Sequence, residues 1–234
     1  MIRLPFTDRF EAGRLLGEEL AKQKLPENTI VLGLPRGGVQ VAFAVSTVLR
    51  APLDVVVVRK LGVPGQPELA MGAIAGGRIR ILDHVLIEDL GISPAEVEAV
   101  ERREIEELER RQKNYRNDRP APDLLDWTVI VVDDGLATGS SMLAAVDYVY
   151  SFRPTKVIVA APVGSVEACR KMSRHADHCV CLVTPEPFLS VGTWYADFAQ
   201  VRDFEVQRLL EQRRRQAGPI CRTVTLAPEL QTKA

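Results

Sequence analysis

The chain has 234 residues, of which 46% are hydrophobic and 26% are charged, and its formal net charge is −1. This length predicts one large domain whose core needs no disulfide or structural metal. The balanced charge gives no basic field for nucleic acid or an anionic membrane, and no apolar run approaches the ~18 residues of a membrane helix. The N-terminus, MIRLPFTDRF, lacks the apolar stretch of a secretory signal. We therefore expect a cytoplasmic protein that binds neither nucleic acid nor a membrane.

Apolar runs and helical patterns alternate along the chain. The runs that predict strands are residues 30–33, 54–58, 73–75, 78–82, 129–132, 156–163 and 179–183. The patterns that predict helices are residues 8–22, 38–49, 94–115, 141–152, 165–174 and 203–215. Strands that alternate with helices in this way predict an α/β fold with a mainly parallel, doubly wound sheet and right-handed crossovers.

Four segments depart from this alternation. Residues 61–72 are rich in glycine and proline and are interpreted as a mobile loop with little apolar area to bury. Residues 94–116 predict a charged helical insertion, whose dense charge indicates either a solvated face or a partner surface. Residues 184–204 hold aromatic side chains among proline and glycine and predict a compact irregular segment. Residues 217–234 are interpreted as a flexible tail, which leaves a single domain over residues 1–216.

Three polar or glycine-rich loops begin where an apolar strand ends. The sequence LPRGG follows residues 30–33, the pair Arg59-Lys60 follows residues 54–58, and DDGLATGSS follows residues 129–132. In an open parallel sheet the carboxyl ends of the strands share one edge, and ligands bind there. We therefore expect the three loops to converge on one site.

The third loop has two parts with opposite electrostatic preferences. The N–H groups and hydroxyls of Ala137–Ser141 stand at a predicted helix N-terminus, which suits a phosphate dianion. Asp133 and Asp134 would repel that phosphate and suit vicinal hydroxyls, directly or with a hydrated divalent cation. A phosphorylated sugar offers both partners. The alternative is a tight strand-to-helix turn capped by an aspartate.

The segment VIVVDDGLATGSS, residues 129–141, resembles the binding signature of the type I phosphoribosyltransferases: an apolar strand, two acids and a small-residue loop with Thr-Gly. It departs in Gly135, where a branched apolar residue is usual, and in Ser141, where threonine is usual. The resemblance covers roughly residues 8–82 and 126–210. It implies Mg²⁺-dependent transfer of a phosphoribosyl group from phosphoribosyl pyrophosphate to a nitrogenous base, with release of pyrophosphate. The alternative is a regulatory protein that binds phosphoribosyl pyrophosphate or a nucleotide without transfer.

The resemblance also implies roles for the three loops. Asp133 and Asp134 would hold the ribose hydroxyls and, through these or through water, the Mg²⁺ ion. The residues that would hold the 5′-phosphate are Ala137, Thr138, Gly139, Ser140 and Ser141. The residues that would hold the pyrophosphate are Arg36, Gly37, Gly38, Arg59 and Lys60, of which Arg36 and Lys60 would also assist catalysis. Glycines let backbone N–H groups approach an anion, and arginine is a forked donor. The alternative for LPRGG is a simple turn, and the alternative for Arg59-Lys60 is a solvated strand end.

Two further segments take the places of the family's lid and hood. Residues 61–72 would exclude water from an oxocarbenium-like transition state, and Glu68, the only charged residue there, would transfer a proton or orient the base. A plain solvated glutamate is the alternative. Residues 184–204 would hold the base, with Phe188, Trp194 or Tyr195 stacked on its ring. The alternative is that these aromatic side chains fill a small satellite core.

The acceptor base is not determined by these residues. Ala137 occupies the position at which hypoxanthine/guanine-type members carry an aspartate, and the Ala-Thr-Gly sequence is more similar to adenine-type members. We also expect a homo-oligomer, in the form of a homodimer.

Cysteines and histidines complete the candidate ligands. Cys169, Cys179, Cys181 and Cys221 form no CxxC pair of the zinc or thioredoxin kind, which favours buried free thiols in a reducing compartment. The histidines lie on separate segments with no matching cysteine spacing, so their pattern does not predict a metal site.

Overall fold

A computed structural model of the chain describes residues 3–76 and 79–217. Most of the predicted tail, residues 218–234, therefore lies outside the described residues. Within the described part of the chain, none of the helices combines the length and the apolar character that crossing a bilayer demands.

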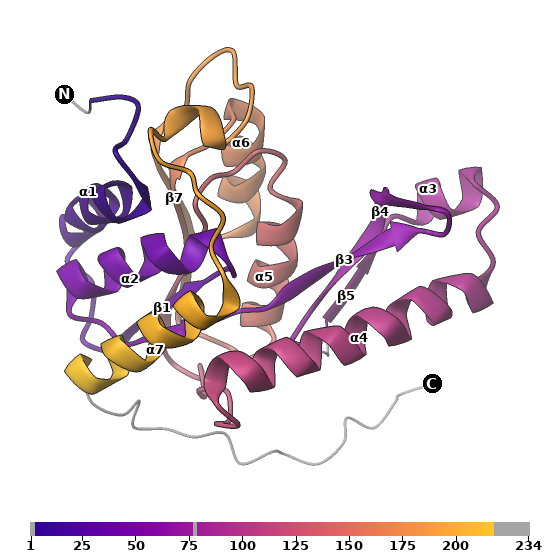
Figure 1. Cartoon of the computed structure of the whole chain (residues 1–234), viewed down its shortest axis with the longest axis horizontal. Coiled ribbons are helices and arrows are strands. Elements are labelled where there is room, and N and C mark those ends of the chain that lie inside the picture. The colour runs from indigo at the N-terminus through magenta and orange to yellow at the C-terminus, as the bar shows by residue number, and fades with distance from the viewer. Residues whose placement is uncertain (1–2, 77–78, 218–234) are drawn as a thin grey trace.

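A five-stranded parallel sheet forms the centre of the body (Figure 1). Its spatial order is β2-β1-β6-β7-β8. The strands are β1 (Thr29–Gly33), β2 (Leu53–Val55), β6 (Thr128–Val132), β7 (Lys156–Val163) and β8 (His178–Val183). Every residue of β1 and β6 is buried, as expected for apolar strands that are covered on both faces. The predicted α/β fold with a mainly parallel sheet is confirmed.

Helices cover both faces of this sheet. The helices on one face are α1 (Arg9–Ala21), α2 (Gly37–Leu49) and α7 (Asp203–Ala217), and those on the other are α5 (Ser140–Tyr150) and α6 (Val166–His175). Alternate strand residues divide between the two layers: Val31 and Ile130 join the first core, and Ile30 and Val129 join the second. This division is the doubly wound arrangement that the sequence predicts.

A second, antiparallel sheet projects from the body as an arm, residues 58–76 and 79–92 (Figure 1). The arm comprises β3 (Val58–Val63), β4 (Gln66–Ala75), β5 (Ile79–Leu82) and α3 (His84–Asp89), and α4 (Pro94–Arg116) runs beneath it back to the body. Helix α3 is not predicted by the sequence pattern. It begins where the Asp83 side chain accepts a hydrogen bond from Leu86 N.

The predicted strand over residues 54–58 is wrong, because this segment belongs to two sheets. Strand β2 ends at Val55, and β3 begins at Val58 in the arm. Val56 and Val57 link the two strands and are buried in opposite cores. The sequence therefore stays apolar between β2 and β3, and its composition does not reveal the break between the strands. Arg59 and Lys60 therefore lie inside β3 and not at the carboxyl end of a parallel strand.

The predicted loop over residues 61–72 is also wrong, because these residues form the β3–β4 hairpin. A proline followed by a glycine with positive φ is typical of a tight turn, and Pro64-Gly65 joins the strands with a Gly65 φ of 78°. Leu61 and Met71 are fully buried, so the segment contributes to the core. The glycine and proline content marks a turn and a bulge within a hairpin.

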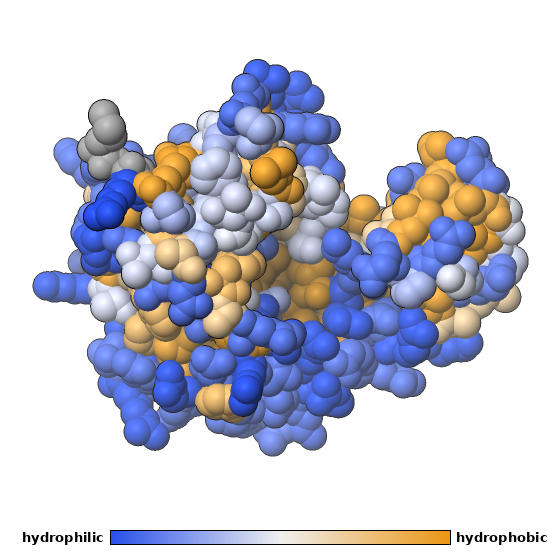
Figure 2. Space-filling view, turned by 45° about the horizontal axis from the view of Figure 1, so that its top comes forward, coloured by the Kyte–Doolittle hydropathy of each residue, from blue (hydrophilic) through white to orange (hydrophobic). Residues whose placement is uncertain are grey.

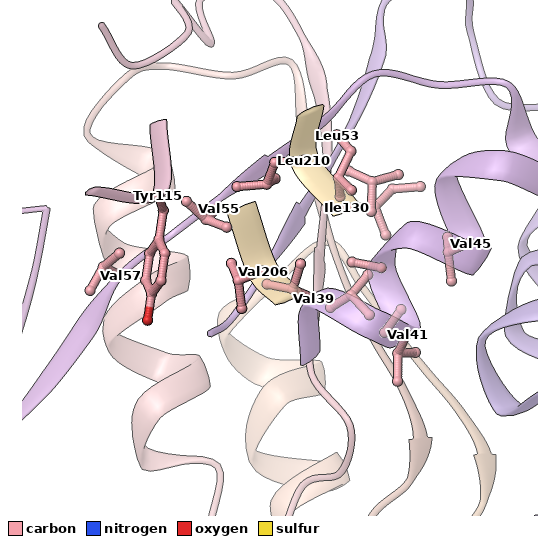
Figure 3. Close-up of a cluster of buried hydrophobic side chains, with 14 of the residues drawn as sticks. Val39, Val41, Val45, Leu53, Val55, Val57, Tyr115, Ile130, Val206 and Leu210 are labelled. Atoms are coloured by element: carbon pink, nitrogen blue, oxygen red, sulfur yellow. The ribbon is translucent and has the colours of Figure 1, made fainter. Parts of the chain in front are cut away.

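Helix α4 confirms the predicted helix over residues 94–116, but its carboxyl-terminal end is not a solvated face. Tyr115 is fully buried and packs with Val206 of α7 over the body sheet (Figure 3). Arg116 Nε donates to Asp54 Oδ1 on β2 at 2.9 Å, in a pair that is almost wholly buried. The helix is thus attached to the edge strand of the body.

Candidate active site

The loops that follow β1 and β6 lie against each other at the carboxyl edge of the sheet. A Cβ atom on Gly37 would overlap Asp134 Oδ2, and one on Gly38 would lie 2.8 Å from Asp133 Oδ1. The two strands are neighbours, with Gly33 paired to Val132. Only glycine lets the first loop approach the carboxylates this closely. The predicted convergence therefore holds for these two loops.

Asp134 is held by Arg9 of α1, a residue that the sequence analysis missed. Arg9 Nε donates to Asp134 Oδ2 at 2.8 Å, and Arg9 Nη1 donates to the Ala199 carbonyl at 2.9 Å. The guanidinium carbon lies 3.8 Å from the centre of the Phe198 ring. The Arg9 side chain is 7% exposed and that of Asp134 is 16% exposed. No sequence signal marks Arg9, because an arginine in a first helical turn is usually solvated.

Burial and mutual repulsion dominate the electrostatics of the two aspartates. Burial raises the pKa of Asp133 well above its usual range, and the adjacent Asp134 carboxylate raises it further. Burial also raises the pKa of Asp134, although the ion pair with Arg9 opposes this rise. Only one guanidinium, that of Arg9, is close to the two carboxylates. When both aspartates are ionised, the group therefore has a net negative charge. Carboxylates in this state fit a hydrated Mg²⁺ ion or the hydroxyls of a sugar.

The loop that follows the acid pair presents polar groups to solvent. Ala137, Thr138 and Ser140 are exposed and Ser141 is half-buried. Helix α5 begins at Ser140, after Gly139 with a φ of 72°. Within residues 3–76 and 79–217, no acceptor faces the backbone N–H groups of residues 137–139. Free N–H groups, hydroxyls and a helix N-terminus together suit a phosphate group.

Arg36 is available to a ligand at the same edge. It stands at the N-terminus of α2, with 38% of its side chain exposed. Its ion-pair partner, Asp203, lies 3.9 Å away and accepts a hydrogen bond from Tyr115 of α4 at 2.7 Å. An exposed pair at such a distance is weak, so the guanidinium can turn toward an anion.

Arg59, Lys60 and Glu68 are not brought to the acid pair by any contact in the described part of the chain. Arg59 Nε donates to Glu104 Oε2 of α4 at 2.8 Å, and Glu104 is buried. Lys60 is exposed on β3. Glu68 is exposed near the tip of the hairpin, which projects away from the body (Figure 1). In this conformation the second predicted loop is therefore separate from the first and third.

The hood segment forms a small core with the N-terminal residues. The Tyr195 ring is buried, with centroid distances of 5.6 Å to Phe6 and 5.1 Å to Phe198. Its hydroxyl donates to the Asp134 carbonyl at 2.5 Å. Trp194 ends the short helix η1 (Gly192–Trp194) and is half-buried. Phe6 and Phe198 both pack against the Tyr195 ring, which favours the satellite core over stacking on a base in this arrangement.

Comparison with known proteins shows the family. The sequence matches the family described as "Phosphoribosyl transferase domain" over residues 8–192. The chain belongs to this family. Two Mycobacterium tuberculosis proteins, from strains CDC 1551 and H37Rv, are each named "Putative phosphoribosyl transferase". Both are 43% identical over 218 residues, or 92% of this chain and 49% of theirs. The chain thus spans about half the length of these relatives.

A solved structure supports the same fold for this phosphoribosyl transferase domain. The crystal structure of TT1426 from Thermus thermophilus is 41% identical, with a TM-score of 0.77, and the match covers 88% of this chain and 98% of that one. The family match contains the acid pair, both converging loops and α4, whereas Trp194 and Tyr195 lie beyond it. The resemblance that the sequence motif indicates is confirmed at the level of the family and the fold.

Proposed function

We propose that the chain is a Mg²⁺-dependent phosphoribosyltransferase that transfers the phosphoribosyl group of phosphoribosyl pyrophosphate to a nitrogenous base. The close contact between Gly37–Gly38 and the acid pair carries the proposal. A ligand lying over this edge meets carboxylates, two helix N-termini and an arginine within one small area. Phosphoribosyl pyrophosphate presents vicinal hydroxyls, a terminal phosphate and a pyrophosphate, which are the chemical partners of these groups.

The two converging loops divide the ligand between them. Asp133 and Asp134 accept hydrogen bonds from the ribose hydroxyls, and Ala137–Ser141 binds the 5′-phosphate. Arg36 and the N–H groups at the start of α2 bind the pyrophosphate. Bound Mg²⁺ would neutralise part of the pyrophosphate charge, and the acid pair is the candidate to hold it through water or the hydroxyls.

The reaction is a substitution at the anomeric carbon. The bond from this carbon to the pyrophosphate oxygen breaks, and its electron pair leaves with the pyrophosphate. A nitrogen lone pair of the base forms the new bond, and the base releases a proton. The carboxylates of Asp133 and Asp134 stabilise the positive charge that develops on the ribose ring, while Arg36 stabilises the departing anion.

The arm contributes only if the β3–β4 hairpin closes over the sheet edge. Closure would bring Arg59 and Lys60 to the pyrophosphate and would exclude water from the oxocarbenium-like transition state. Glu68 would then reach the base for proton transfer, and Phe188 or Trp194 would be the stacking partner in the hood.

Glu68→Gln is expected to lower kcat with little change in KM, and an unchanged kcat would remove Glu68 from the mechanism.

Pyrophosphate release tests the proposed function directly. The chain is incubated with phosphoribosyl pyrophosphate and a panel of purines, pyrimidines and related heterocycles, with Mg²⁺ or with EDTA. We expect release with at least one base, and only in the presence of Mg²⁺. Calorimetric binding of phosphoribosyl pyrophosphate without release for any base would contradict transfer and would support a regulatory binding protein.

One observation favours that second candidate, in which the chain binds the sugar phosphate and regulates a partner. Helix α4 reaches the two arginines proposed for pyrophosphate: Glu104 binds Arg59 directly, and Tyr115 binds Asp203, the neighbour of Arg36. A partner that moved α4 would therefore change the charges available to the ligand. In this candidate α4 is the partner surface.

Glu104→Gln tests the link between α4 and the site. Loss of the carboxylate charge should free Arg59, and an ion pair of about 1 kcal/mol corresponds to roughly fivefold tighter pyrophosphate binding. Glu107→Gln is the matched control, because Glu107 pairs only with Arg110 and Arg111 of the same helix among the described residues. Titration calorimetry measures the pyrophosphate affinity of both variants. Unchanged pyrophosphate affinity in a folded Glu104→Gln variant would make Arg59 a structural residue.

We also propose that the chain forms a homo-oligomer through the arm. Hydrophobic residues gather on the surface of the arm (Figure 2). Leu69, Val85 and Leu90 are 41%, 70% and 46% exposed there. Grouped exposed apolar side chains are typical of protein interfaces. Light scattering should give a multiple of the mass of one chain, and a monomer mass would contradict this proposal.

A further inference from the structure

Three of the four cysteines meet between α6 and β8. Cys169 lies on α6, and Cys179 and Cys181 lie two residues apart on β8, so that both point to the same face of the strand. The three Sγ atoms all lie within 4.8 Å of one another, and those of Cys169 and Cys181 are 2.7 Å apart. The packing of α6 on β8 creates this cluster, and no CxxC spacing in the sequence marks it.

Gly164, between β7 and α6, leaves the room that the sulfurs occupy. A Cβ atom at this position would lie 2.6 Å from Cys169 Sγ and 3.2 Å from Cys181 Sγ, too close for any other residue without a shift. All three cysteines are free thiols and only partly buried. A solute ion can therefore reach them from solvent.

We propose that Cys169, Cys179 and Cys181 form a three-thiolate site for one soft metal ion, Zn²⁺ or Cu(I). Thiolates are the preferred ligands of these ions. A metal–sulfur bond of ~2.3 Å sets two sulfurs at most ~4.6 Å apart, so sulfurs gathered within the observed range surround one ion after small shifts. The main shift is a widening of the contact between Cys169 and Cys181. Zn²⁺ would take its fourth ligand from solvent, on the exposed side.

Each of the three thiols loses its proton when the ion binds, because the thiolate is the form that binds metal ions.

The position of the cluster indicates what a metal would do there. Strand β8 is the last strand of the body sheet and pairs with β7. A metal bound to α6 and β8 together would join the edge strand to the helix that covers it. The start of α6 also supports the phosphate-binding loop, because Ser165 Oγ donates to the Ala137 carbonyl at 2.7 Å. The site is therefore structural, and it does not depend on the proposed transferase activity.

Metal titration of the reduced, full-length chain tests the site. Zn²⁺ alone and, without oxygen, Cu(I) alone are titrated in competition with a chromophoric chelator. We expect one ion per chain for at least one of the two metals. Cys169→Ser, Cys179→Ser and Cys181→Ser should each lower the affinity by about 100-fold or more, above the range for changes beyond the direct ligands. Cys221→Ser is the control and should bind as the unchanged chain does.

Two further measurements keep the test informative if a serine variant folds poorly. In the unchanged chain the bound ion should raise Tm, because it stabilises the folded state alone, and should protect Cys169, Cys179 and Cys181 but not Cys221 from alkylation. Failure of the reduced chain to bind either ion, or equal binding by the three variants, would overturn the proposal. A Cys169–Cys181 disulfide formed in air, without metal binding by the reduced chain, would also overturn it and identify a redox pair.

Discussion

Asp133→Asn is expected to raise the thermal stability of the chain while lowering its affinity for Mg²⁺-bound phosphoribosyl pyrophosphate by at least about tenfold, or roughly 1.4 kcal/mol. The two effects have one cause. Burial and the neighbouring carboxylate raise the pKa of Asp133, which means that the folded chain disfavours its ionised form. Asparagine keeps the shape and removes the charge. The ligand, however, requires the charge, because a neutral amide binds Mg²⁺ and ribose hydroxyls less well.

Asp134→Asn should stabilise the chain less than Asp133→Asn does. Burial raises the pKa of Asp134 as well, but the ion pair with Arg9 opposes this rise. The amide would leave the buried Arg9 guanidinium without its counter-ion, a loss that the remaining Ala199 carbonyl and Phe198 ring limit. The affinity for the ligand should fall as it does for Asp133→Asn. The two neighbouring aspartates are thus distinguished by stability and not by binding.

The pH dependence follows from the direction of the pKa shift. A carboxyl group whose folded pKa is raised destabilises the fold at pH values above that raised pKa, and the penalty disappears as the pH falls to the ordinary value. The gain in Tm of Asp133→Asn should therefore be largest above the raised pKa and fade below it. Ligand affinity of the unchanged chain should decrease over the same fall in pH.

Scanning calorimetry measures Tm and titration calorimetry measures ligand affinity, each at a series of pH values. Asp126→Asn is a suitable control. Asp126 is exposed and has a φ of 62°, a conformation that asparagine tolerates. Unchanged ligand affinity in the Asp133→Asn, Asp134→Asn double variant would refute the assignment of the acid pair.

The sequence could predict those parts of the fold that depend on local pattern and on parallel topology. Strand β7 has the predicted bounds, Lys156–Val163, because turn residues flank its apolar run. The convergence of the first and third loops was predictable for a related reason. Strands β1 and β6 are parallel, so the segments that follow them must leave from one edge, whatever their distance in the sequence.

The parts that could not be predicted depend on long-range packing. Arg9 and Asp134 are 125 positions apart, and nothing in the first helical turn shows that this arginine is buried. The change of sheet at Val56-Val57 is hidden because both valines are buried, each in a different core. Cys169 and Cys181 meet only because α6 folds back onto β8. Contacts of this kind are set by the tertiary structure and leave no periodic signal.

Arg36→Ala should weaken pyrophosphate binding by about ten- to hundredfold and leave ribose 5-phosphate within about twofold, because a charge-assisted contact contributes about 1.5–3 kcal/mol. Only pyrophosphate meets the loop after β1 in the proposed division of the ligand. Asp133→Asn should weaken the binding of ribose 5-phosphate and leave that of pyrophosphate nearly unchanged, since the acid pair faces the ribose. Calorimetric titration of both variants with both ligands gives four affinities.

Equal weakening of the binding of both ligands by Arg36→Ala would mean that the loops do not divide the ligand, provided that thermal melting shows an intact fold. If neither affinity changes, the sequence LPRGG is a turn that positions Asp133 and Asp134 without binding the anion itself.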